Sequence, residues 1–325
     1  MVVQGKPLEN GAHSEVIDLS DPSKTCTSLP DFTTVREAML EGGCGGLLNG
    51  VPVTCGGQYY DGYESYNCFR FDRNGSSLLT KMTRAFHYAA STVLDRDTLW
   101  MTGGYTTVSF LRDTTEFVKL DGTSVPGPRL PFETFGHCMV KVNESLVVMI
   151  GGWNNDDGSV FLFDPTSDFK MTQGPKLKTP RYLHSCGLIE IGGVKKVMVV
   201  GGESMQGIGY YYRSSEIWDL NSSSDWAYGS RNFFLEKINF HEASFLGPSL
   251  PVFVTCHSSN AMVPSPKGGG AFMVGCKDLI GNNDDIYELV IDSSNRMSWN
   301  FYKEIQYPRI NLVPMLIPDD LTTCT

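Results

Sequence analysis

Residues 147–152 read VVMIGG, and this apolar run ending in a glycine pair has three counterparts elsewhere in the chain. The counterparts are PVTCGG at 52–57, LWMTGG at 99–104 and VMVVGG at 197–202. From Gly57 to Gly104, Gly152 and Gly202, the second glycines lie 47, 48 and 50 residues apart. A period of about 40 to 50 residues is typical of β-propeller blades, whereas helical repeats show a 3.6-residue pattern. The repeat therefore predicts a propeller.

The same order of features surrounds each glycine pair. An Arg is followed three residues later by a His in TRAFHYA at 83–89 and in TPRYLHSC at 179–186. An apolar strand, a tight turn, the glycine strand, a variable loop and an alternating strand follow. Four short strands separated by turns make one blade. We interpret the glycines as scaffold, because a residue without a Cβ fits crowded strands or a positive φ.

This pattern resembles the Kelch repeat, in which a glycine pair is followed by an aromatic residue and a Trp, with Pro-Arg before the next unit. The resemblance covers nearly the whole chain. The Trp of the fourth strand is present at Trp226 and Trp299, while Leu79 and Phe169 occupy the corresponding stretches elsewhere. The resemblance implies a Kelch-type propeller of an unassigned subfamily.

The last third of the chain predicts two further blades. FMVGC at 272–276 indicates a fifth blade, with an insertion around 258–270 and outer strands at 285–292 and 297–305. The final stretch resembles the first two strands of a sixth blade, and residues 13–30 resemble its outer strands. We therefore predict an all-β fold: one six-bladed Kelch-type propeller over 1–325, with blade six shared between about 13–30 and 308–325. Such closure removes an exposed sheet edge.

Composition limits the classes of partner. The formal net charge of -10 and the pI of 5.1 disfavour nucleic acid, because binders of phosphate backbones gather Lys and Arg. No apolar run approaches the roughly 20 residues needed to cross a bilayer. We expect a monomer without a cofactor and without membrane insertion.

Four cysteines lie where neighbouring strands of one blade could bring them within bridging distance. The predicted disulfides are Cys55 with Cys68 and Cys256 with Cys276. The alternative is that all nine cysteines are buried thiols, since free Cys is often a small core residue.

Three sequons for N-glycosylation, at Asn74, Asn143 and Asn221, fall in predicted turns. Glycans require such accessible positions. Together with the predicted disulfides they favour an extracellular chain, with a cytoplasmic location as the alternative.

Two patterns could indicate metal binding. His87, His137 and His184 lie at nearly the same repeat position, and Asn-Asn-Asp-Asp occurs at 154–157 and 282–285. We interpret the histidines as structural hydrogen-bonding residues and the tetrads as turns, for which Asn and Asp are favoured. No metal is predicted. Nucleophile-elbow, zinc-protease and phosphate-loop motifs are missing, so we predict no catalytic residues and no enzymatic activity.

The loops between second and third strands are rich in aromatic residues, and a propeller gathers these loops on one end of its disc. Exposed loops are usually polar, whereas Tyr and Trp are enriched at recognition surfaces. The alternative is that the rings pack over one another to order long loops. The predicted ligand-binding residues are Tyr59, Tyr60, Tyr63, Tyr105, Phe110, Trp153, Tyr210, Tyr211 and Tyr212.

We therefore predict a non-enzymatic recognition module, secreted or on the cell surface, that binds a protein or a glycan. One alternative is an intracellular Kelch module for a cytoskeletal or degradation partner. Another is a propeller enzyme, because fold alone does not determine chemistry.

Overall fold

The structure is a computed structural model in which β-strands form every regular element of the described residues, apart from a single residue of 3₁₀ geometry. The described residues are 2–3, 6–7, 14–27, 40–59, 61–108, 110–204, 211–221, 226–229, 248–252, 254–256, 261–278, 285–305, 309–310, 312–318 and 321–325. Within them no helix is long and apolar enough to cross a membrane.

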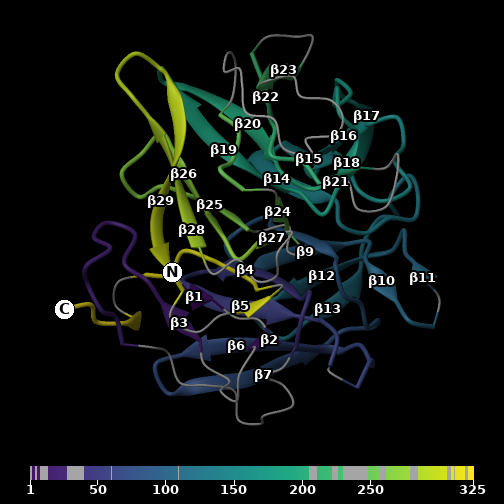
Figure 1. Cartoon of the computed structure of the whole chain (residues 1–325). Coiled ribbons are helices and arrows are strands. Elements are labelled where there is room, and N and C mark those ends of the chain that lie inside the picture. Colours follow the sequence, from purple (N-terminus) through teal and green to yellow (C-terminus); the bar gives the residue numbers. More distant parts are fainter. Residues whose placement is uncertain are drawn as a thin grey trace.

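Five antiparallel sheets of four strands each follow one another along the chain (Figure 1). The first contains β4 (Cys44–Leu48), β5 (Val51–Cys55), β6 (Asn67–Asp72) and β7 (Gly75–Lys81), and the second β8 (Ala90–Val93), β9 (Thr98–Thr102), β12 (Thr115–Lys119) and β13 (Ser124–Pro126). The third contains β14 (Cys138–Asn143), β15 (Leu146–Ile150), β16 (Val160–Asp164) and β17 (Lys170–Gln173). The fourth contains β19 (Ser185–Ile191), β20 (Val194–Val200), β22 (Ser215–Asp219) and β23 (Trp226–Gly229), and the fifth β25 (Met262–Pro264), β26 (Ala271–Val274), β28 (Asp285–Ile291) and β29 (Met297–Glu304).

The first strands of successive sheets contact one another, in the order β4, β8, β14, β19 and β25. Each sheet is therefore a propeller blade whose first strand is innermost. Every predicted glycine strand is the second strand of its blade. The predicted outer strands of the fifth blade are β28 and β29, in agreement with the sequence. The prediction for 258–270 is wrong, because this stretch contains the inner strand β25 rather than an insertion.

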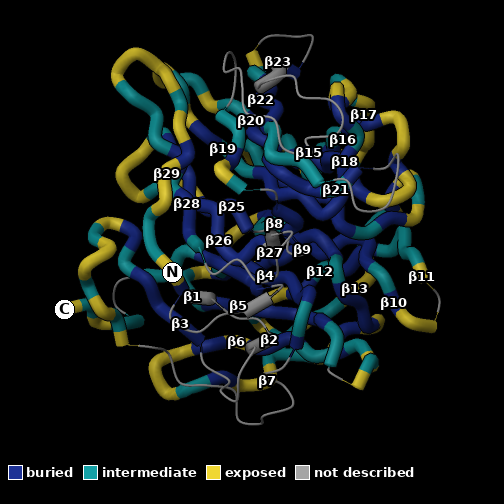
Figure 2. The backbone as a smooth tube through the Cα atoms, viewed as in Figure 1, coloured by how far each residue is buried: buried dark blue, intermediate teal, exposed yellow. Residues whose placement is uncertain are grey.

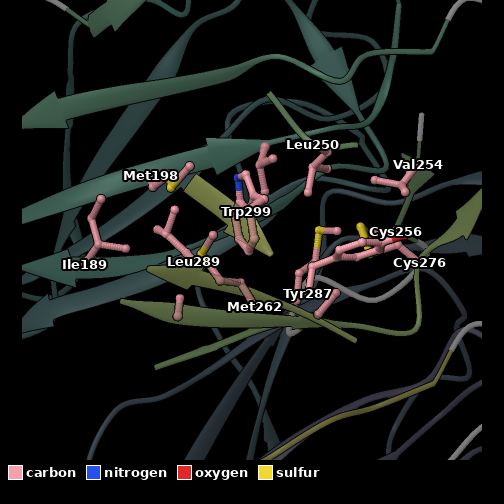
Figure 3. Close-up of a cluster of buried hydrophobic side chains, with 14 of the residues drawn as sticks. Ile189, Met198, Leu250, Val254, Cys256, Met262, Cys276, Tyr287, Leu289 and Trp299 are labelled. Carbon is pink, nitrogen blue, oxygen red and sulfur yellow. A yellow bond between two sulfur atoms is a disulfide. The ribbon is translucent and has the colours of Figure 1, made fainter. Parts of the chain in front are cut away.

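An apolar cluster fills each interval between neighbouring blades, and the inner strands are buried (Figure 2). Between the fourth and fifth blades, Met198 and Ile189 pack with Leu289 and Trp299 (Figure 3). Burying a side chain of this size stabilises the fold by about 1.5 to 3 kcal/mol. The blades are therefore held mainly by contacts between their faces.

The terminal segments occupy the interval between the fifth and first blades. Ile17 and Leu19 pack with Phe272 of the fifth blade, while Val16 packs with Phe69 of the first. The strands here are short: β1 (Val2–Val3) pairs with β3 (Glu15–Val16), and β2 (Lys6–Pro7) pairs with β30 (Arg309–Ile310).

The predicted sixth blade is therefore wrong as a four-stranded sheet, and the structure shows five blades. The segments at about 13–30 and 308–325 meet as predicted, but their described residues form two-residue ladders. A disulfide between Cys26 and Cys324 joins them. Backbone hydrogen bonds flank this disulfide, from Thr25 N to Thr325 O at 3.1 Å and from Thr27 N to Thr323 O at 2.9 Å.

Disulfides also lie within and between blades. The two predicted pairs, Cys55–Cys68 and Cys256–Cys276, are both disulfides in the structure. A further disulfide that the sequence did not predict, Cys138–Cys186, links the inner strands of the third and fourth blades.

Cys44 is a free thiol and is buried. It lies directly opposite Cys55 in the β4–β5 ladder, and Cys55 lies opposite Cys68 in the β5–β6 ladder. Residues directly opposite in antiparallel strands share one face of the sheet. Three cysteines therefore form a row across the first blade.

Candidate functional site

A short rung of backbone pairing lies ahead of the inner strand of each blade. It pairs the residue after the glycine pair, or after Gly275-Cys276 in the fifth blade, with a residue of the segment that enters the inner strand. The rungs are Glu41 with Gln58, His87 with Tyr105, Phe135 with Trp153, Tyr182 with Glu203, and Thr255 with Lys277. The rung positions are equivalent from blade to blade, so their residues lie at the same level of the propeller.

In four blades, the residue that follows the rung residue of the entering segment has a left-handed backbone conformation. These residues are Gly42, Tyr88, Gly136 and Leu183, with φ values of 65°, 56°, 63° and 50°. A left-handed conformation costs a residue with a Cβ about 1 to 2 kcal/mol.

Backbone hydrogen bonds join these same residues from blade to blade. They run from Tyr88 N to Gly42 O at 2.7 Å, from Gly136 N to Tyr88 O at 3.0 Å, from Leu183 N to Gly136 O at 2.7 Å and from Cys256 N to Leu183 O at 2.6 Å. The left-handed residues thus allow each blade to hydrogen-bond to the next. These hydrogen bonds offset the cost of the left-handed conformation and fix the neighbouring rung residues in place.

The glycine pairs are needed where the next blade approaches. A Cβ on Gly103 would lie 2.6 Å from Thr134 O and 2.8 Å from His137 Cε1. A Cβ on Gly151 would lie 2.4 Å from Arg181 O. These distances are shorter than van der Waals contact, so the glycines are scaffold positions in the structure.

Aromatic side chains from the second, third and fourth blades form a continuous row beside the rungs. We call Phe110, Tyr105, Phe135, Trp153 and Tyr182 the aromatic row. Adjacent ring centroids lie 6.0 Å apart for Phe110 and Tyr105, 5.9 Å for Tyr105 and Phe135, 5.8 Å for Phe135 and Trp153, and 4.9 Å for Trp153 and Tyr182. These separations are within the range of favourable ring pairing.

The rungs position the middle of the row. Trp153 N donates to Phe135 O at 2.9 Å, and Thr134 Oγ1 donates to Trp153 O at 2.7 Å. The indole ring stacks on Phe135 with an interplanar angle of 20° and remains 36% exposed. Trp153 therefore presents a fixed aromatic surface to solvent.

The structure brings together only part of the predicted ligand-binding set. Tyr105, Phe110 and Trp153 belong to the row, while Tyr63 is 68% exposed on the first blade. Tyr59 is half-buried, and its hydroxyl donates to Ser65 Oγ at 3.1 Å.

The remaining predicted residues lie at the fourth blade or outside the described part. Tyr211 pairs with Glu203, and the Tyr212 ring lies 5.0 Å from the buried Arg181 guanidinium. Tyr60 and Tyr210 lie outside the described residues.

Sequence reasoning missed Phe135 and Tyr182, which link the predicted aromatic residues to one another. Both precede a repeated His by two residues, in TFGH and RYLH. An aromatic residue recurring at this repeat position was a usable signal.

Polar side chains beside the aromatic row form hydrogen bonds within the protein. The buried Glu64 carboxylate accepts hydrogen bonds from Thr107 N at 2.7 Å and Thr107 Oγ1 at 3.3 Å, and lies 3.5 Å from His87 Nδ1. The Tyr182 hydroxyl donates to Glu203, and burial together with this carboxylate raises the pKa of Tyr182. These polar groups therefore order the loops around the row.

The three repeated histidines are buried, and both ring nitrogens of His184 are without a hydrogen-bond partner in the described part of the chain. His137 Nε2 shares a hydrogen bond of 2.7 Å with Thr102 Oγ1, and His184 packs against Gly202. His87 belongs to a rung, two residues before the repeat position that His137 and His184 share. Burial lowers the pKa of His87 to about 4 and that of His137 to about 3. No group of three potential metal ligands occurs in the described part of the chain.

The predicted turns are present where they are described. Asn155 holds the first Asn-Asn-Asp-Asp turn, since its amide nitrogen donates to Ser159 O at 2.7 Å. Most of the second tetrad lies outside the described residues. Three exposed residues, Asn74, Asn143 and Asn221, lie at strand ends or turns.

The arrangement of blades around their inner strands defines the chain as an all-β propeller. Comparison with known proteins found no matching family model and no matching curated protein. Among solved structures the chain is similar to YjhT, with a TM-score of 0.65 and 12% sequence identity over 89% of this chain and 91% of that chain. At this identity the likeness shows the fold alone.

Proposed function

We propose that this chain is a non-enzymatic recognition module of Kelch type, which works outside the cell and binds a protein or glycan through the aromatic row. The observation that carries the proposal is the position of the row: three neighbouring blades contribute to it, and hydrogen bonds across the rungs hold Trp153 exposed. Rigid aromatic side chains supply contact area at little cost in conformational entropy.

Two further features support this proposal. The glycine pairs on which the resemblance to Kelch repeats rests have φ near 100° at the second glycine, at Gly57, Gly104, Gly152 and Gly202. The carboxylates beside the row are committed to Thr107 and Tyr182, which favours binding over proton-transfer chemistry.

Replacing Trp153 by alanine is expected to weaken ligand binding by at least about 30-fold, because a buried aromatic anchor is worth about 2 kcal/mol or more at an interface. Binding is measured with the strongest hits from a glycan array and from a peptide-display library. Phe301→Ala is the matched control, since Phe301 is an exposed aromatic residue on the outer strand β29. Unchanged binding by W153A, or a loss of thermal stability that accounts for weaker binding, would contradict the proposal.

If the protein works outside the cell, its disulfides should be formed and its sequons should carry glycans. Four disulfides use eight of the nine cysteines, so only Cys44 is expected to react with a thiol reagent in denaturant, and nine cysteines should react after reduction. Treatment with a glycosidase is expected to lower the intact mass, through loss of glycans from Asn74, Asn143 or Asn221. The sample must come from cells that naturally make the protein. Nine reactive thiols without reduction, on an unglycosylated chain, would instead support the intracellular Kelch alternative.

A further inference from the structure

A hairpin projects from the second blade at one end of the aromatic row. It consists of β10 (Tyr105–Thr106) and β11 (Phe110–Leu111), inserted between β9 and β12 (Figure 1). Val108 is 86% exposed and Phe110 is 63% exposed. Large apolar side chains exposed together on a protruding element mark interaction sites.

The first blade holds this hairpin in place. The Glu64 carboxylate accepts hydrogen bonds from both the backbone and the hydroxyl of Thr107. Phe110 has a φ of 55°, which is unfavourable for a residue with a Cβ, and such strain persists where surrounding contacts determine the conformation. The exposed side chains are thus ordered before any partner arrives, which reduces the entropic cost of binding.

The polar side chains near the hairpin favour a protein surface over a sugar. Recognition of hydroxyl groups needs side-chain donors and acceptors that are free to face the ligand. Here Gln58 Nε2 donates to Gly62 O at 3.1 Å, Glu64 is bonded to Thr107, and Glu203 is bonded to Tyr182. In the described part of the hairpin, the most exposed apolar side chains are Val108 and Phe110.

The charged residues of the loops that follow the glycine pairs favour a basic partner. In the described parts of the loops that follow the first four glycine pairs, every exposed charged residue is an aspartate: Asp61, Asp156 and Asp157. Asp157 pairs with Lys176, and the whole chain has a net charge of -10. Complementary charge at the edge of an interface accelerates association and selects the partner.

We propose that Val108 and Phe110 form the centre of a protein–protein interface, whose partner presents an apolar pocket bordered by Lys and Arg side chains. This inference rests on the proposed function and narrows its ligand to a protein. Glu64 is a positioning residue for the interface, because it acts through Thr107.

The test uses the full chain and a library of displayed random 12-residue peptides. Selected peptides are expected to combine aromatic or aliphatic residues with Lys or Arg. Synthetic copies of the strongest binders are titrated by fluorescence anisotropy. V108S/F110S is expected to weaken their binding by at least 100-fold. The matched control is V125S/F301S, which replaces the same residue types at exposed positions on outer strands and should change binding by less than threefold.

Two further measurements test the details. Glu64→Gln is expected to weaken binding by about tenfold, because it loses the charge-assisted bonds to Thr107. Raising the salt concentration from 50 to 300 mM is expected to weaken binding by a similar factor, because it screens the aspartates.

Selection of acidic or purely polar peptides, failure to select any peptide, or equal losses in V108S/F110S and V125S/F301S would overturn the inference. Binding to a glycan array that requires Trp153 but not Val108 or Phe110 would overturn it while leaving the proposed function intact. Absence of any peptide or glycan binding that depends on Trp153 would contradict both.

Discussion

Replacing Cys26 and Cys324 together by serine is expected to lower the free energy of unfolding by about 6 kcal/mol. The disulfide spans a sequence separation of 298 residues, and the entropy that a cross-link removes from the unfolded chain grows with the logarithm of the loop length. The bond also joins the two segments that fill the interval between the fifth and first blades. Chemical denaturation under non-reducing conditions measures the loss.

The matched control removes Cys256 and Cys276, which are separated by only 20 residues. The same relation gives a loss of about 3 kcal/mol for this pair. Hydrogen exchange provides a second readout: in C26S/C324S, β6 and β26 should lose protection before β15, because their residues pack against the terminal segments. Equal protection losses in all blades, or no greater destabilisation than in the control, would contradict the assigned role of the terminal disulfide.

Acidification is expected to destabilise the protein well above the pH at which carboxylates become protonated. Burial holds the pKa values of His87 and His137 at about 4 and about 3, below the ordinary 6.5, and also lowers that of His184 well below it. As the pH falls below 6.5, the unfolded chain takes up protons that the folded chain excludes. Stability is therefore complete above 6.5 and falls below it, by about 1.4 kcal/mol per pH unit for each histidine.

The three histidines together predict a loss of about 3 to 4 kcal/mol between pH 6 and pH 5. Urea titrations at half-unit steps from pH 8 to pH 5 measure it, and the range above pH 7 is the internal reference. His87→Gln should reduce the slope by about one third, because His87 contributes one of the three excluded protons. A free energy of unfolding that stays constant from pH 7 to pH 5 would show that these histidines titrate normally in the folded chain.

The blade pattern was largely predictable, because it depends on a backbone requirement that the sequence displays. Glycine pairs are required where the next blade approaches within contact distance, as at Gly103 and Gly151. The blade count was not predictable, because strand formation at the termini depends on pairing between segments about 300 residues apart. Those segments retain a blade-like sequence, yet their described residues pair over only two positions at a time.

The sequence indicated that the candidate site is aromatic, but it did not indicate all of the residues that form it. Aromatic enrichment of the loops indicated Trp153, Tyr105 and Phe110, because these residues lie in the loops after the glycine pairs. Phe135 and Tyr182 come from the segments that enter the inner strands. Only the backbone pairing of the rungs places them at the same level of the propeller as the loop residues Tyr105 and Trp153. The Cys138–Cys186 disulfide was missed for the same reason, since it crosses between blades.

The row of cysteines in the first blade has a consequence for oxidative folding. Cys55 lies opposite both Cys44 and Cys68, so two disulfide isomers of identical mass are compatible with the strand register. Exchange between them requires attack by the Cys44 thiolate on Cys55, with Cys68 as the leaving thiolate. Burial raises the pKa of Cys44 to about 12, which leaves almost no thiolate at neutral pH. The choice of isomer is therefore made before the blade packs and is kinetically locked afterwards.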